Sequence, residues 1–176
     1  SAKILGLPYP GGPLIDKYAQ PGNPKAFQFT KPKVGDLDFS FSGLKTAILY
    51  FIQKKVKENP SFIEENLVDI CASIQHTIIE ILMEKLKNVV KQTGIKHIAI
   101  AGGVSANSEI RKRLELAEKH FGWTTYIPKF EYCTDNAGMI AITAYFKFLK
   151  NEFCDQSVTA KARMAVQTNS IHKNFG

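Results

Sequence analysis

The sequence predicts a helix-rich α/β domain with a small, incomplete parallel sheet. Two observations lead to this prediction: two short apolar segments with strand-like composition, at residues 95–101 and 123–127, and a helical pattern directly after each, at 105–120 and 135–150. A strand–helix–strand–helix order implies parallel strands joined by crossover helices. Two strands are too few to cover helices this apolar. We therefore expect upstream chain to supply more strands.

The first part of the chain divides into a loop region and a helix. Residues 1–41 are rich in Gly and Pro, which predicts loops around one short helix at 13–19. From residue 42 onward, apolar side chains recur on one helical face, and Asn59-Pro60 ends that helix. The apolar positions are Leu44, Ile48, Phe51, Ile52 and Val56.

A long helix is predicted next. Ser61 and Glu64 have the spacing of a capping box, and Gly94 supplies the C-terminal stop. The expected buried stripe consists of Val68, Cys71, Ile74, Ile78, Leu82, Leu86 and Val89. This helix should form the centre of the core.

The remaining elements follow the α/β order. Residues 95–101 should be a buried strand, and 123–127 a second one. The helix at 105–120 should bury Ile110, Leu114 and Ala117 and turn Arg111, Lys112 and Arg113 outward. The helix at 135–150 should pack through Met139, Ile142, Phe146 and Leu149. The tail at 167–176 is expected to be disordered.

Composition limits the class of protein. With 44% hydrophobic and 22% charged residues, the chain resembles a soluble globule, and we expect neither a membrane span nor a signal peptide. The three cysteines are odd in number and far apart, which favours a reducing, cytoplasmic setting. A net charge of +7 favours phosphate-rich partners such as nucleic acid; a solvated, lysine-rich surface is the alternative.

Residues 98–107 indicate a nucleotide-sized ligand. An apolar strand runs into Gly102 and Gly103, and a helix begins near Asn107. Glycines let the backbone approach a ligand, and a helix start offers free N–H groups. The alternatives are that the glycines allow tight packing and that Asn107 is only a cap. Gly11-Gly12 could likewise be only a turn.

Asp135 lies in Cys-Thr-Asp-Asn, at the start of the predicted last helix. A carboxylate there can cap the helix, carry charge or hold a metal ion. A simple N-cap is the alternative. We expect His76 and His97 to be packed, hydrogen-bonded side chains and Cys133 to be a small buried residue.

Four motifs together resemble the C-terminal half of one family. They are Gly-Leu-Pro-Tyr-Pro-Gly-Gly-Pro at 6–13, Asp-Phe-Ser-Phe-Ser-Gly-Leu-Lys-Thr at 38–46, Ala-Gly-Gly-Val-Ser-Ala-Asn at 101–107 and Cys-Thr-Asp-Asn-Ala at 133–137. They are similar to the TsaD family, the tRNA threonylcarbamoyladenosine synthases once described as O-sialoglycoprotein endopeptidases. The resemblance covers residues 1–166. Gly138 replaces a usual alanine, which loosens the first helical turn by about 1 kcal/mol.

The resemblance implies a fold and a reaction. The fold is the C-terminal lobe of an actin-like, sugar-kinase (ASKHA, ribonuclease H-like) protein, with residues 1–166 forming part of that lobe. The reaction transfers a threonylcarbamoyl group from threonylcarbamoyl-AMP to N6 of the adenosine beside the anticodon, in tRNAs that read ANN codons. The implied partners are tRNA, the missing N-terminal lobe and accessory proteins of the bacterial complex, with no membrane.

The resemblance also implies site residues. Gly12, Asp16, Gly102, Gly103 and Asn107 should contact the adenylate. Asp135 should be one ligand of an iron or zinc ion whose two histidine ligands lie outside this chain. No residue here is assigned as the catalytic acid or base.

One carboxylate is a poor metal site, so we expect the isolated chain to bind metal weakly and to be inactive. Two other functions remain open: a carbamoyltransferase or small-molecule kinase of the same superfold, and a non-catalytic scaffold half of a tRNA-modification complex. A protease is the least supported reading, because the sequence has no His-Glu-x-x-His motif and no nucleophile elbow.

Overall fold

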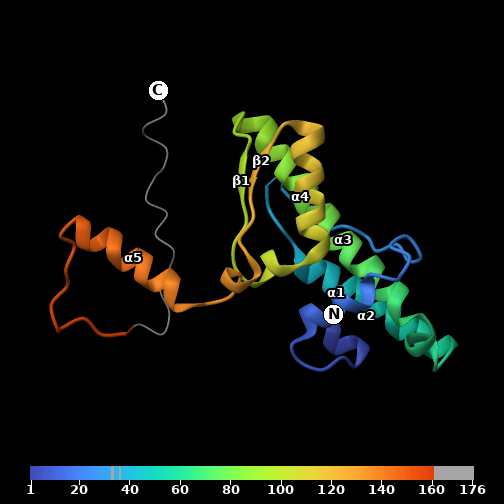
Figure 1. Cartoon of the computed structure of the whole chain (residues 1–176). Coiled ribbons are helices and arrows are strands. Elements are labelled where there is room, and N and C mark those ends of the chain that lie inside the picture. The colour runs from blue at the N-terminus through green and yellow to red at the C-terminus, as the bar shows by residue number, and fades with distance from the viewer. Residues whose placement is uncertain (33, 36, 161–176) are drawn as a thin grey trace. The chain divides into compact units, whose positions relative to one another are not determined.

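The computed structural model describes residues 1–32, 34–35 and 37–160 (Figure 1). The chain divides into two units, one spanning Ser1–Asp135 and one starting at Asn136. The boundary expected at residue 166 and the tail at 167–176 lie outside the described residues.

Three helices of the first unit match the sequence pattern. After a 3-10 turn η1 (Ala2–Leu5), α1 spans Gly11–Ala19, α2 spans Phe41–Glu58 and α3 spans Phe62–Thr93. In α2 the buried side chains are Leu44, Ile48 and Ile52, as the periodicity predicts. Gly94 ends α3 with a φ of 72°, which confirms it as the C-terminal stop.

The capping box predicted for α3 does not form. The Ser61 side chain makes no capping hydrogen bond. Asn59 acts instead: its Oδ1 accepts from Ser61 N at 3.0 Å, and its Nδ2 donates to Glu65 Oε2 at 2.9 Å. Asn59 therefore contacts both the backbone at the N-cap of α3 and a carboxylate in its first turn.

The buried surface of α3 is wider than one stripe. Ile70, Cys71 and Ile74 are fully buried as part of the cluster formed with α1 and α2. Farther along α3, Ile79 belongs to a second cluster with β1 and α4. Because neighbours pack on more than one side of α3, single-face periodicity underestimates its burial, while Val68 is 36% exposed against expectation.

Helix α3 corrects our expectation that no segment is apolar and long enough to cross a membrane. It has 32 residues and an 18-residue window of mean hydropathy 1.2, which passes such a test by length and composition. Yet Ile70 and Ile74 fill the core between neighbouring helices. This burial is typical of the central helix of a globular domain.

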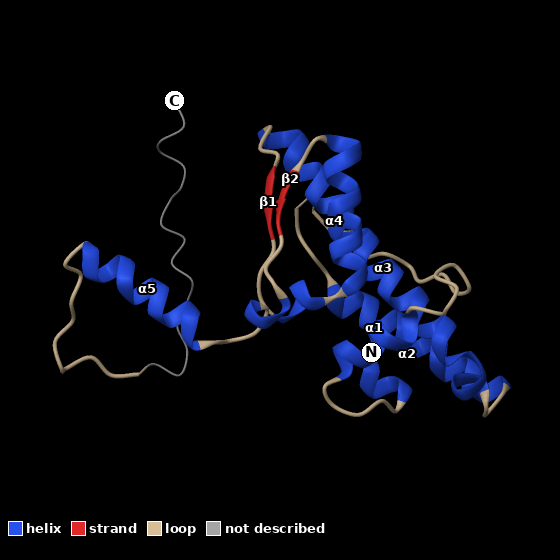
Figure 2. Cartoon of the chain, in the orientation of Figure 1, coloured by secondary structure: helices blue, strands red, loops and turns tan. Residues whose placement is uncertain are grey.

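The two predicted strands are present but short. β1 (His97–Ala99) and β2 (Thr124–Tyr126) pair in parallel, with Ile98 opposite Thr125 (Figure 2). Helix α4 (Ser108–Phe121) connects them, so the crossover is confirmed. β1 is not fully buried as expected: Ile98 faces the core, whereas His97 and Ala99 are exposed. The cluster around Ile98 contains side chains of α3 and α4, so these helices cover one face of the strand.

Helix α4 starts later than predicted, after a 3-10 turn η2 (Gly103–Ala106). Its buried residues are Ile110, Leu114 and Ala117, which confirms the predicted inward face. Arg111 is not turned to solvent, however, because its guanidinium bonds to two nearby loops.

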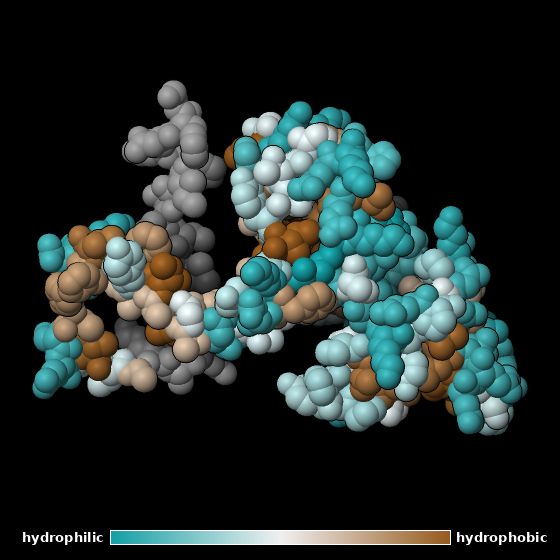
Figure 3. Space-filling model, viewed as in Figure 1, coloured by the Kyte–Doolittle hydropathy of each residue, from teal (hydrophilic) through white to brown (hydrophobic). Residues whose placement is uncertain are grey.

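The second unit contains α5, which spans Ala137–Leu149. The helix is confirmed, but its expected packing is not: Met139, Ile142, Phe146 and Leu149 are all exposed. None of the residues of α5 is buried, and Figure 3 shows apolar atoms along it. A helix that is apolar on all sides is typical of one that packs against several neighbours.

Candidate functional site

Asp16 and Asn107, predicted to share a ligand, lie close together in the structure. Gln75 of α3 bridges them: its Nε2 donates to Asp16 Oδ1 at 3.1 Å, and its Oε1 accepts from Asn107 Nδ2 at 2.8 Å. Gln75 is 9% exposed, so this amide is held inside the protein. The bridge brings α1, α3 and the start of α4 to one place.

The Asp16 carboxylate lies at the N-terminus of α4. Its Oδ2 accepts from Ser108 N at 3.0 Å, and its Oδ1 accepts from Ser108 Oγ at 2.7 Å. A helix N-terminus favours negative charge because its first N–H groups have no partner within the helix. Asp16 is therefore oriented by Ser108 and Gln75 together.

Asn107 is the N-cap of α4. Its Oδ1 accepts from Ile110 N at 3.0 Å, so Asn107 caps the helix. Capping uses the side-chain oxygen, and the bridge to Gln75 uses the amide nitrogen. The side chain is thus held from both ends.

Gly102 and Gly103 form an open stretch of backbone at the carboxyl end of β1. Gly102 has φ 75° and ψ −179°, a conformation that other residues rarely adopt. Ser105 Oγ donates to the Gly102 carbonyl at 2.6 Å and fixes the turn. Apart from the glycine itself and its neighbours in the chain, no heavy atom lies within 4 Å of the position that a Cβ would take at either glycine. Tight packing is therefore not the reason for these glycines.

Gly12 shows the same openness in the first turn of α1. A Cβ there would have no neighbour within 4 Å, whereas a Cβ on Gly11 would collide with Ala2. Gly11 is therefore the packing glycine and Gly12 the accessible one. Gly12 precedes Asp16 by one helical turn, so both lie on one face of α1.

Asp135 makes none of the hydrogen bonds that join this group. It is exposed, and it follows the 3-10 turn η3 (Phe130–Tyr132). It is not the N-cap of α5, because Asn136 takes that position and its Oδ1 accepts from Met139 N. Among the described residues, no three His, Cys, Asp or Glu side chains form a group that could hold a metal ion. These residues alone do not make a metal site, although Asp135 offers an accessible carboxylate.

Comparison with known proteins gives the family. The sequence model for tRNA N6-adenosine threonylcarbamoyltransferase, TsaD, matches residues 1–142. The chain belongs to the TsaD family. A relative of that name from Christiangramia forsetii is 67% identical over 163 residues, which cover 93% of this chain and 48% of the relative. Relatives of the same name from Cytophaga hutchinsonii and Riemerella anatipestifer are 52% and 57% identical. The alignments cover 94% and 92% of this chain, and 48% and 47% of those relatives. The chain therefore spans about half the length of its relatives.

The structure also shows the surroundings of other ionisable side chains of this TsaD-family chain, two histidines and two cysteines. His76 Nδ1 lies 3.4 Å from Arg113 Nη2 in a hydrogen-bond contact, as expected, and its Nε2 lies 3.3 Å from Glu80 Oε1. His97 is hydrogen-bonded as expected, since its Nδ1 lies 3.1 Å from the Tyr126 hydroxyl, but it is exposed and stacks on Tyr126, so it is not packed in the core. Cys133 is buried, as predicted. Burial raises the pKa of Cys71 to about 11, which keeps that thiol protonated near neutral pH.

Sequence reasoning missed two polar residues of this hydrogen-bonded group, Gln75 and Ser108. Gln75 carries a signal, because it is a polar residue among the buried apolar positions of α3. Ser108 carries none, since a serine after an N-cap is ordinary at a helix start. Their roles depend on contacts with Asp16, which is 59 residues from Gln75 and 92 from Ser108 in sequence.

Proposed function

We propose that this chain is the C-terminal part of an enzyme that transfers a threonylcarbamoyl group from threonylcarbamoyl-AMP to N6 of the adenosine beside the anticodon, in tRNAs that read ANN codons. The observation that carries the proposal is the joined group of Asp16, Gln75, Asn107 and Ser108, together with the open glycines in the turn that leads to Asn107. The chain supplies part of the active site.

The open glycines and the ordered polar groups suit an adenylate. Gly102 and Gly103 offer backbone that a phosphate or ribose can approach without meeting a side chain. A carboxylate has about four lone-pair positions on its two oxygens, and Asp16 uses three in the bonds from Gln75 and Ser108. The remaining position can accept a ribose hydroxyl. Gly12, one helical turn before Asp16, provides a second stretch of backbone that a ligand can approach.

The contribution of this chain to the reaction is positioning. The exocyclic amine of adenosine is a weak nucleophile, so alignment of the two substrates supplies much of the rate. Asp16 and Asn107 are held rigidly enough for this role, since each side chain has two separate partners. No side chain of the chain is assigned as a general acid or base.

We also propose that Asp135 is one ligand of a divalent metal ion, iron or zinc, whose other protein ligands lie in the missing half. When bound, such an ion stabilises negative charge as a Lewis acid. The support for this proposal is the family motif together with the exposure of Asp135 at the end of the first unit. An exposed carboxylate remains free to meet ligands from another part of the protein.

The same proposal includes the wider assembly. The helix-rich α/β arrangement with parallel β1 and β2 suits the C-terminal lobe of an actin-like fold. The exposed apolar surface of α5 suits burial against the missing N-terminal lobe. The net charge of +7 suits tRNA, and three free cysteines suit the cytoplasm. Accessory proteins of a bacterial tRNA-modification complex complete the proposed partners.

Reconstitution tests the proposed function. The chain, the N-terminal half that it lacks, and their mixture are each incubated with tRNA and threonylcarbamoyl-AMP, and modified adenosine is measured by mass spectrometry of the digested tRNA. We expect modification by the mixture and none by either half alone. Transfer to a small-molecule acceptor but not to tRNA would contradict the proposal, and so would a complete protein that does neither.

A further inference from the structure

We infer that Arg111 is a positioning residue that holds the segment bearing Gly102 and Gly103 against the segment that leads to Asp135. This inference rests on the proposed function, because it assigns a common support to the nucleotide floor and the metal-binding carboxylate. The two segments are the loops that follow β1 and β2. Arg111 lies in the first turn of α4, between them in sequence.

The guanidinium of Arg111 bonds to both loops at once. On the side of β1, Nε donates to Ser105 O at 2.7 Å. On the side of β2, Nη2 donates to Pro128 O at 2.6 Å and lies 3.2 Å from Cys133 Sγ. Two of the residues that Arg111 contacts are buried: Ser105 is 1% and Cys133 2% exposed. Because these two residues are buried, they give the guanidinium of Arg111 fixed partners.

Each contact of Arg111 is linked to a proposed site residue, either by one further hydrogen bond or by a short stretch of chain. Ser105, which Arg111 holds by its carbonyl, in turn holds the Gly102 carbonyl through its hydroxyl at 2.6 Å. Cys133 precedes Asp135 by two residues. A shift of the guanidinium would therefore move the glycine backbone and the carboxylate relative to each other.

The ring of Phe130 completes the arrangement. The guanidinium carbon lies 4.2 Å from the centre of that ring, which is a cation–π contact. Phe130 begins η3, and the bonds to Pro128 and Cys133 lie on either side of it in sequence. Arg111 thus fixes the whole turn between β2 and Asp135.

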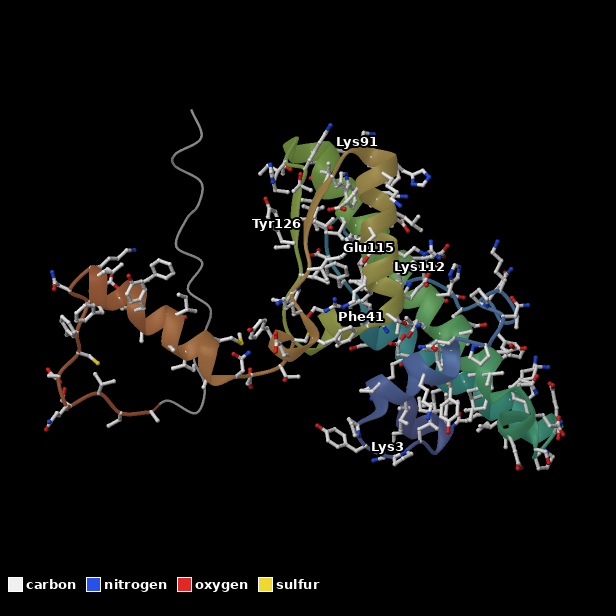
Figure 4. All side chains as sticks on the ribbon, viewed as in Figure 1. Lys3, Phe41, Lys91, Lys112, Glu115 and Tyr126 are labelled. Carbon is white, nitrogen blue, oxygen red and sulfur yellow. The ribbon has the colours of Figure 1, made fainter. Side chains whose placement is uncertain are left out.

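Arginine is the side chain that this geometry requires. Its planar group presents several N–H donors in fixed directions, whereas a lysine ammonium is a single point on a flexible stem. The next arginine on α4 has a different environment: Arg113 Nε pairs with Glu109 Oε1 at 2.7 Å, and its Nη2 lies 3.4 Å from His76 Nδ1. Lys112 and Glu115, labelled in Figure 4, lie on the same helix and are exposed. Arg113 is therefore a matched control for Arg111.

The test uses the complete protein, with the N-terminal half present, and three variants: Arg111→Met, Arg111→Lys and the control Arg113→Met. Affinity for Zn²⁺ and for AMP is measured by calorimetry, and kcat and KM by tRNA modification. We expect both Arg111 variants to lose Zn²⁺ and AMP affinity by about 10- to 100-fold, the usual effect of removing an outer support of a site. The control should change either affinity by no more than about threefold.

Hydrogen exchange separates this inference from the proposed function. In both Arg111 variants, peptides covering 102–107 and 128–135 should exchange faster, while those of α2 stay unchanged. Unaltered exchange in these two segments, or unaltered Zn²⁺ and AMP affinities in active protein, would overturn the role of Arg111. If the wild-type protein is inactive but hydrogen exchange is still faster in the Arg111 variants, the proposed function is overturned and the positioning role of Arg111 remains.

A folding defect is handled by a fourth variant. If Arg111→Met does not fold, Phe130→Leu removes the ring that covers the guanidinium while keeping all hydrogen-bond donors. A smaller loss of AMP and Zn²⁺ affinity, in the same direction as that of Arg111→Lys, supports the inference. Affinities equal to those of the wild type in both of these folded variants overturn it.

Discussion

Replacing Asp135 by alanine in the complete protein is expected to lower transfer to tRNA by about 10³-fold or more, because a metal ion contributes several kcal/mol of charge stabilisation to such a reaction. Metal content after dialysis should fall in parallel. Asp135 is exposed and at the end of the first unit, so its loss should leave the core intact. Activity and metal content are measured on the same preparations.

Glu131→Ala is the matched control for Asp135. Glu131 is another exposed carboxylate, four residues upstream in η3. We expect this variant to keep both metal and activity. Equal losses in the two variants would show a general effect of negative charge, and an active, metal-loaded Asp135→Ala protein would remove Asp135 from the site.

Leu114→Ala should lower the free energy of unfolding of this chain by about 3 kcal/mol, a typical cost for emptying a buried leucine site. Leu114 is fully buried in the cluster formed with Ile98, Ile110 and Trp123. That cluster holds α4 against β1, so its loss should also loosen the start of α4 and with it Asn107. Urea denaturation followed by circular dichroism measures the change.

Leu116→Ala provides the comparison on the same helix. Leu116 is 39% exposed, so its truncation removes little buried surface and should cost less than about 1 kcal/mol. The difference between these two leucines tests whether α4 faces the sheet as the structure shows. Similar costs for both would mean that α4 is rotated or is not packed on β1 in solution.

The helices of this chain could be predicted from sequence because their signals are local. The spacing of Leu44, Ile48 and Ile52 sets the buried face of α2, and Gly94 marks the end of α3. The capping box did not form although Ser61 and Glu64 have the right spacing, because the backbone N–H of Ser61 donates to the Asn59 side chain instead. The spacing of residues in the sequence alone cannot predict which of several polar side chains caps a helix.

Burial was harder to predict than helix formation. The apolar pattern of α5 is clear, but Met139 and Phe146 are exposed. In β1, Ile98 is buried, whereas His97 and Ala99 are exposed. Periodicity predicts which face is apolar, whereas burial depends on which neighbours are present.

The candidate site was predictable only in part. Gly102, Gly103 and Asn107 are close in sequence, so their common turn could be inferred from the strand–glycine–helix pattern. The bridge through Gln75 depends on α3 contacting both α1 and the start of α4, which no local pattern encodes. Arg111 was misjudged because its neighbours in sequence suggested a basic outer face, whereas its partners come from two loops.

The central claim is that the open glycine backbone beside Asp16 and Asn107 binds the AMP part of the donor. A crystal structure of the complete protein with AMP tests this most directly. We predict that AMP lies on the Gly102-Gly103 backbone, with a ribose or phosphate oxygen in hydrogen-bond contact with Asp16 or Asn107. AMP bound elsewhere, with these glycines open to solvent, would contradict the account.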